Sequence, residues 1–315
     1  MLHANAFPQE GNGLLLLIFS PRCILQYNYL LLDSQGFHII FIIYNFNMST
    51  VYKKFTLGDK LTTEQHHFFN EHGFIHFKNF INPETVQLIT RASEQVQEQW
   101  IKNEVAKVNG VPIKYGKDLN GDTIVQRFAF INQHHPVFAE FIQDPRFNTL
   151  LDIIGPDARF GTHEKDGMVL NHYVNSEQSS FTKMGWHTDG LRDIFHGQKL
   201  NPMLNVGIHL STLKPENGGL RILPGTHKQG LYQMLFKKKY FLDHDADENE
   251  LAITPEAGDL TIHDGRLWHR VAQSSVSGEA SRRRVIYVPI IAGKYAPKDA
   301  NSPTVFYQKF AGLVK

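Results

Sequence analysis

The pattern of apolar and polar positions predicts helices in the first part of the chain. Apolar residues recur at roughly helical spacing behind Asn82-Pro83, where the Asn side chain can cap a helix and Pro suits its first turn. Val86, Ile89, Val96 and Trp100 would then share one buried face. The predicted helices are a short one from Thr62 or Thr63 through Phe69 with its end near Gly73, a long one from Asn82, and one over 145–154 with Gly155 as its stop.

After Asp157 the pattern changes to short apolar runs separated by turn signals such as Asn217-Gly218 and Pro224-Gly225. The predicted strands are 74–80, which lies between the first two helices, and then 168–174, 204–210, 220–223, 259–262 and 283–291. Helices followed by many short strands are typical of a mainly β fold with flanking α-helices, so we expect a β-sandwich or jelly roll with helices packed on one sheet.

The first 47 residues differ from the rest in composition. They contain only three charged residues, no Lys, and two apolar runs that are too short to span a bilayer. No basic start or small-residue cleavage site of a signal peptide is visible. Residues of ordinary composition begin at Met48, and no repeat or long linker follows. We therefore expect 48–315 to form a single domain and 1–47 to be a leader outside it, either an over-extended start or a disordered appendage.

Composition limits the classes of function. The 315-residue chain has a formal net charge of +1, which gives no electrostatic reason to expect nucleic acid. Its single Cys excludes an internal disulfide, and we expect a cytoplasmic protein that does not bind membranes. The 17 His favour a metal site but also supply many histidines without a metal-binding role.

The segment from Gly185 to Gly190 carries the most specific chemistry. It contains His187 and Asp189 two residues apart, so both side chains leave the same face if the segment is extended. Two His and one carboxylate with open positions form the facial triad of non-haem Fe(II) oxygenases. His269 is the favoured third ligand because it follows the apolar pair Leu267-Trp268, whereas His263 precedes a turn.

A run of three Arg leads into the last apolar strand. A buried strand with an inward-facing Arg needs an anion, and a carboxylate suits the guanidinium. Alternation places Arg283 and Arg284 on opposite faces, and the sequence alone leaves open which of the two faces inward.

Two long excursions interrupt the strands, over 191–202 and 230–250, and loops of this length are often lids. The acidic stretch within the second, 243–247, lacks the Gly and the final Glu of a calcium loop. We interpret it, together with Lys237-Lys238-Lys239 before it, as a solvated charged segment.

From about Leu61 to Ile291 the chain resembles the phytanoyl-CoA dioxygenase family of Fe(II)- and 2-oxoglutarate-dependent oxygenases. The motifs that carry the resemblance occur in family order and spacing: Trp186-His187-Thr188-Asp189, 216–228 (ENGGLRILPGTHK), 258–263 (GDLTIH) with His269, and Arg283-Arg284.

The resemblance implies a double-stranded β-helix (jelly roll, cupin-like) that binds Fe(II) through His187, Asp189 and His269. It also implies 2-oxoglutarate as cosubstrate, with its distal carboxylate on Arg283 and Met168 lining its pocket. With O2, such an enzyme releases succinate and CO2 and usually hydroxylates a C–H bond of a small organic molecule. Because Asp189 is present, halogenation is not expected.

Two departures from the family pattern concern the cosubstrate pocket: Gly207 stands where Trp is common, and Val271 where some members have Ser. Two other classes remain as alternatives. One is a cupin-like metalloprotein, an isomerase or hydrolase, which has no need of Arg283. The other is a metal-binding module without turnover.

Overall fold

The computed structural model describes residues 15–18, 26–33, 36–43, 52–179, 181–195 and 199–305, and it divides into two compact units between Tyr52 and Lys53. In the first unit, β1 (Leu15–Ile18), β2 (Gln26–Asp33) and β3 (Gly36–Ile43) form an antiparallel sheet in the order β1-β2-β3. Met48 and Cys23 lie outside the described residues, and the assignment of 1–47 as a leader stays a prediction.

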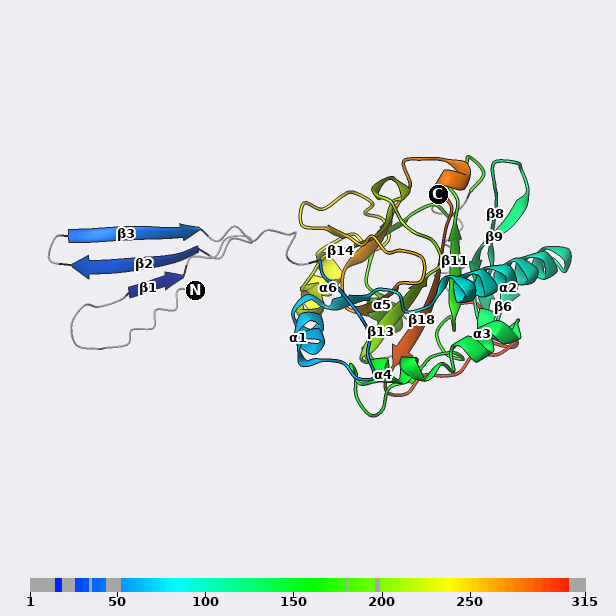
Figure 1. The fold of residues 1–315 in the computed structure, drawn as a ribbon, viewed down its shortest axis with the longest axis horizontal. Coiled ribbons are helices and arrows are strands. Elements are labelled where there is room, and N and C mark those ends of the chain that lie inside the picture. The colour runs from blue at the N-terminus through cyan, green and yellow to red at the C-terminus, as the bar shows by residue number, and fades with distance from the viewer. Residues whose placement is uncertain are drawn as a thin grey trace. The chain divides into compact units, whose positions relative to one another are not determined.

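The second unit contains two facing sheets, helices and short connecting elements (Figure 1). The large sheet has the strand order β4-β5-β16-β13-β18-β11-β9-β8, with β10 paired to β18. Its strands are β4 (Lys54–Phe55), β5 (Phe74–Phe77), β8 (Lys114–Lys117), β9 (Thr123–Phe128), β10 (Arg159–Phe160), β11 (Val169–Tyr173), β13 (Met203–His209), β16 (Leu260–Asp264) and β18 (Arg283–Ile291).

The small sheet has the order β12-β17-β14-β15. Its strands are β12 (Met184–His187), β14 (Gly219–Ile222), β15 (Leu251–Ala252) and β17 (His269–Ala272), and a separate hairpin pairs β6 (Lys107–Val108) with β7 (Val111–Pro112). The fold is mainly β with flanking helices, as predicted, and it belongs to the cupin or jelly-roll class without a closed barrel.

Local capping signals fix the two longest helices near the N-terminal end of this unit. In α1 (Thr63–His72), Thr62 and Gln65 form a reciprocal capping box, and Gly73 ends the helix in the left-handed conformation at φ 76°. In α2 (Pro83–Lys102), the Asn82 side chain accepts a hydrogen bond from the amide of Thr85. Both helices were therefore predicted correctly from short sequence signals.

The predicted helix over 145–154 is wrong in detail. A 3₁₀ turn at Pro145–Phe147, capped by Asp144, precedes the single helical turn of α4 (Asn148–Leu151). The predicted strand over 74–80 also ends early, at Phe77, because Asn79 is left-handed at φ 54° and its amide donates to Asp259. The remaining helices are α3 (Pro136–Phe141), α5 (Asp189–Phe195) and α6 (Leu231–Phe236).

The main hydrophobic core lies between the large sheet and the helices. Side chains from α2 such as Ile89, Val96 and Trp100 pack with buried strand residues such as Val206 and Ile286, on the helix-covered face of the large sheet. In Figure 1, α2 lies beside β9 and α3. Alternation along the same strands directs the polar residues to the other face, toward the small sheet.

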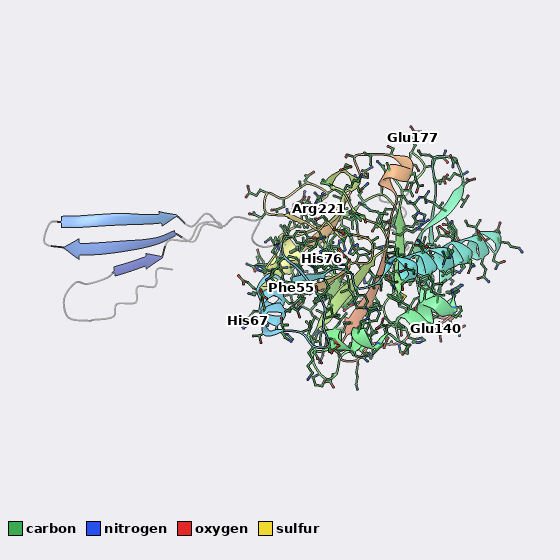
Figure 2. The ribbon with its side chains drawn as sticks, in the orientation of Figure 1. Phe55, His67, His76, Glu140, Glu177 and Arg221 are labelled. Atoms are coloured by element: carbon green, nitrogen blue, oxygen red, sulfur yellow. The ribbon has the colours of Figure 1, made fainter. Side chains whose placement is uncertain are left out.

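The inner face of the large sheet is unusually rich in polar residues. His76 on β5 is fully buried and binds Asp259, while His209 on β13 binds Thr261 on β16. Figure 2 shows His76 within the body of the unit, whereas Glu140 and Glu177 lie at its edge. This polar interior is the part of the fold that could hold a charged ligand. No helix in the described part of the chain is long and apolar enough to cross a membrane.

Candidate metal centre

The two sheets bring the three predicted metal ligands together. His187 ends β12, Asp189 begins α5, and His269 begins β17. Because His187 and His269 are directly paired across β12 and β17, their rings lie side by side with centroids 4.1 Å apart. One ligand atom from each of the three residues lies within 4.8 Å of the others. The chain direction turns between His187 and Asp189, so this convergence does not depend on a fully extended segment.

Each candidate ligand histidine is oriented by its own chain segment. His187 Nδ1 lies 2.8 Å from the carbonyl oxygen of Gly185, and His269 Nδ1 lies 2.9 Å from that of Leu267. A carbonyl can only accept, so Nδ1 carries the proton in both rings and Nε2 offers its lone pair to the site. This is the arrangement in which a metal-binding histidine donates its other N–H to a fixed acceptor.

The charges at the site suit a divalent cation. Burial alone would raise the pKa of Asp189, but contact with His263 and the nearby imidazoles hold it well below its usual range. Burial lowers the pKa values of His187 and His269. The carboxylate is therefore ionised and both imidazoles are neutral at neutral pH, which are the forms that bind metal.

Asp189 has two further neighbours on the inner face of the large sheet. Asn205 on β13 donates to Asp189 Oδ2 at 3.0 Å, and His263 on the paired strand β16 places Nε2 3.5 Å from the same oxygen. Sequence analysis did not identify Asn205. Asn205 is marked only by its position directly opposite His263 in the pairing of β13 with β16, and this register is not encoded by any local sequence signal.

His263 is the least satisfied of the histidines around the centre. It is 1% exposed, its ring centroid lies 4.4 Å from that of His269, and neither ring nitrogen has a hydrogen-bond partner among the described residues. Unpaired buried polar groups of this kind are rare and are concentrated where a ligand, ion or water completes them. The structure thus places both candidate histidines beside Asp189, with His269 in the three-residue group.

The structure resolves which Arg of the last strand faces inward. Arg283 is 4% exposed, and its guanidinium donates to the carbonyls of Asn217, Ala272 and Thr182 and lies 4.5 Å over the ring of Tyr173. No carboxylate among the described residues lies within ion-pair distance of Arg283. Arg284 points to the opposite face and pairs with Glu94 at 3.1 Å.

Three further residues bear on the surroundings of Arg283 and the metal centre. The Tyr173 hydroxyl beside Arg283 is buried without a hydrogen-bond partner in the described chain, and burial raises its pKa to about 12. Met168 is fully buried, but its side chain packs in the core below the helices and is not brought together with Arg283. The role of Met168 in a cosubstrate pocket stays a prediction.

At Gly207 a side chain would meet Tyr287 and Thr261, so the family's common Trp does not fit this arrangement.

The second long excursion docks against β12, the strand that carries the candidate ligand His187. Trp186 donates its backbone N–H to Asp243 at 2.8 Å and its indole N–H to Asp245, and Phe241 donates back to Trp186. The ring of Phe241 stacks on His187 with centroids 4.7 Å apart, and the Tyr240 hydroxyl donates to the Thr188 carbonyl. The segment 240–245 therefore covers one side of the centre, as expected of a lid. Residues 191–195 of the first excursion belong to α5, and 196–198 lie outside the described residues.

Comparison with known proteins places these residues in context. The model of the family described as "Phytanoyl-CoA dioxygenase (PhyH)" matches residues 69–283, which is more than half of the chain and includes His187, Asp189, His269 and Arg283. The chain belongs to the phytanoyl-CoA dioxygenase family. A search of curated protein sequences found no match.

Solved structures share the fold at low sequence identity. The α-ketoglutarate-dependent carbocyclase SnoK from nogalamycin biosynthesis is 17% identical, with 84% of this chain and 94% of SnoK covered and a TM-score of 0.54. EctD from S. alaskensis with bound Fe is 14% identical (78% and 80% covered, TM-score 0.55). HygX from Streptomyces hygroscopicus, with nickel and 2-oxoglutarate bound, is 17% identical (75% and 89% covered, TM-score 0.52).

Family membership and the His-Asp-His group give the class of reaction. The protein is an Fe(II)- and 2-oxoglutarate-dependent oxygenase that uses O2. The family and cofactor predictions made from the sequence are confirmed.

Proposed function

We propose that His187, Asp189 and His269 bind Fe(II), that Arg283 binds the distal carboxylate of 2-oxoglutarate, and that the enzyme hydroxylates a C–H bond of a small organic molecule. When bound, iron and 2-oxoglutarate supply oxidation by O2 coupled to decarboxylation, with succinate and CO2 as coproducts. The proposal of a small-molecule substrate is supported by relatives of the same fold, among them the epimerase SnoN, which was crystallised with Fe3+, α-ketoglutarate and nogalamycin RO.

The observation that carries the proposal is the unneutralised guanidinium of Arg283. A buried cation whose donors reach only carbonyl groups retains its full charge, and a carboxylate would offset the cost of burying it. The unpartnered hydroxyl of Tyr173 lies at the same place and can donate to the same anion. A cupin-like isomerase or hydrolase would have no use for this arrangement.

The protein's own groups have defined tasks in this reaction. The two imidazoles and the Asp189 carboxylate would hold the metal with three protein ligands, which leaves coordination positions for ligands that exchange. Asn205 restrains the carboxylate through its hydrogen bond, and the aromatic segment at Tyr240 and Phe241 limits the access of water from the side of His187.

Anaerobic titration with 2-oxoglutarate tests the proposal. Apo-protein loaded with Fe(II) should develop the visible metal-to-ligand charge-transfer band, and Asp189→Ala should abolish it. Arg283→Gln should weaken 2-oxoglutarate binding by about tenfold or more, since it removes a charge-assisted contact. The matched control is Arg284→Gln, which removes the neighbouring guanidinium from the opposite face and should leave the titration unchanged. A normal band in Arg283→Gln with unchanged affinity would contradict the cosubstrate assignment.

A further inference from the structure

Three cationic side chains converge on one buried carboxylate beside the metal centre. Arg127 Nη2 lies 2.8 Å and Arg192 Nη1 2.9 Å from Asp166 Oδ2, and Lys298 Nζ lies 3.6 Å from Asp166 Oδ1. Arg127 and Lys298 alone bring two positive charges to the single negative charge of Asp166. The side chains of the three cations are 18%, 20% and 20% exposed, so solvent reaches them although Asp166 is buried.

The adjacent ion pair does not change this balance. Lys165 Nζ lies 2.6 Å from Asp193, which also accepts a hydrogen bond from the Tyr295 hydroxyl. One positive and one negative charge cancel there. A cavity of about 40 Å³ lies between the two groups, lined by Lys165, Asp166, Arg192, Asp193, Tyr295, Ala296 and Lys298. Burial lowers the pKa of Lys298, Asp166 raises it, and the guanidinium groups of Arg192 and Arg127 lower it further.

The cation cluster Arg127–Arg192–Lys298 connects two sides of the proposed active site. Arg192 follows Asp189 by three residues on α5, so its side chain leaves the helix one turn from the proposed metal ligand. Arg127 donates to Asn171 at 3.0 Å, and Asn171 is paired with Val285 of β18, the strand that begins with Arg283. A group bound by these cations would therefore lie close to both the metal position and the cosubstrate strand.

We infer that Arg127, Arg192 and Lys298 bind an anionic group, a carboxylate or a phosphate, of the molecule that is oxidised. The inference rests on the proposed function and adds a substrate class to it. Guanidinium groups bind both kinds of anion through paired hydrogen bonds, and an excess of partly buried cations is costly until an anion offsets it. An anion held one helical turn from Asp189 anchors the substrate, so that a neighbouring C–H bond can be presented to the metal position.

Equilibrium dialysis with radiolabelled inorganic sulfate tests the inference on the protein loaded anaerobically with Fe(II) and 2-oxoglutarate. We expect one sulfate per chain, with the affinity lowered about tenfold or more in Arg192→Gln and in Lys298→Gln. The matched control is Arg159→Gln, because Arg159 pairs with the single carboxylate of Glu164 at 3.0 Å and should not contribute. Two separate variants keep the test informative if one of them fails to fold.

Three results would overturn the inference: no bound sulfate in wild-type protein with a normal charge-transfer band, equal sulfate binding in all variants, or displacement of sulfate by excess 2-oxoglutarate. Failure of the charge-transfer band itself would instead refute the proposed function. A free regulatory anion is distinguished from a substrate group by competition. Organic acids that stimulate succinate release should displace the labelled sulfate, and their methyl esters should do neither.

Discussion

His263 Nε2 lies 3.5 Å from Asp189 Oδ2, and neither ring nitrogen of His263 has a hydrogen-bond partner in the described chain. The imidazole is buried next to the metal position without completing a hydrogen bond. A buried polar group without a hydrogen-bond partner is energetically unfavourable, and it usually binds a ligand, ion or water that supplies the missing hydrogen bond.

Replacing His263 by Phe should separate stability from metal binding. The apo-protein should become more stable by about 1 kcal/mol, because the substitution removes buried unsatisfied polar atoms. Fe(II) affinity should fall about tenfold, since Asp189 loses a neighbour that orients it. Urea unfolding and anaerobic Fe(II) titration measure the two effects. His227→Phe is the control, because His227 is also buried with one unpartnered ring nitrogen but lies on the turn after β14. A loss of stability without a change in iron affinity would show that His263 is only structural.

Removal of a ligand side chain tests which histidine completes the metal site. His269→Ala should lower bound iron from about one per chain to nearly none, because two protein ligands hold Fe(II) weakly. Elemental analysis after dialysis gives the stoichiometry. If His269→Ala keeps its iron while His263→Ala loses it, the third ligand is His263.

The docking of the lid depends on the absence of a side chain at Gly185. A Cβ there would lie 2.4 Å from the Phe241 carbonyl oxygen and 2.8 Å from that of Asp243, both of which are backbone atoms. Gly185→Ala should therefore displace the lid and cost about 1–3 kcal/mol of stability. Limited proteolysis within 230–250 should become faster. Gly230→Ala is the control, because a Cβ at Gly230 meets nothing within 4 Å, and equal behaviour of the two variants would contradict the docking.

Acid should destabilise the apo-protein through buried neutral histidines. Burial lowers the pKa of His209 to about 3, and burial with two nearby Arg lowers that of His172 well below its usual value. Between about pH 6.5 and the folded pKa, the unfolded chain binds a proton that the folded chain does not, so stability falls as pH falls. Each histidine contributes a slope of up to about 1.4 kcal/mol per pH unit.

Urea unfolding with a chelator present, from about pH 7 to about pH 4, measures this slope, and His209→Gln should reduce it. The substitution keeps a side chain that can bind Thr261, the partner of His209 Nε2. An unchanged slope would mean that His209 does not take part in the acid response.

Sequence patterns predicted those features that depend on neighbouring residues. Thr62 and Asn82 each cap a helix through a residue three positions on, so α1 and α2 could be predicted directly. By contrast, the helix predicted at 145–154 is a 3₁₀ turn at Pro145–Phe147 followed by one helical turn at Asn148–Leu151, and no local signal marks the change between them.

Features that depend on strand pairing could be predicted only in part. The motif spacing identified the residues that converge, but the pairing of His187 with His269 follows from a register that no local signal encodes. The choice between Arg283 and Arg284 likewise required their partners, a ring of carbonyl groups in one case and Glu94 in the other. Asn205 and Phe241 were missed because nothing in their own sequence surroundings marks them.

Each candidate ligand imidazole donates to the carbonyl group two residues earlier, so the two rings are oriented independently of each other. The ring orientation of His187 is fixed by its hydrogen bond to Gly185, and that of His269 by its hydrogen bond to Leu267. Loops that shape the substrate pocket can therefore vary in length and sequence while the orientation of both imidazoles is inherited from their own strands. Because different residues determine the loops and the orientation of the imidazoles, substitutions in the loops can change substrate specificity without altering the metal centre.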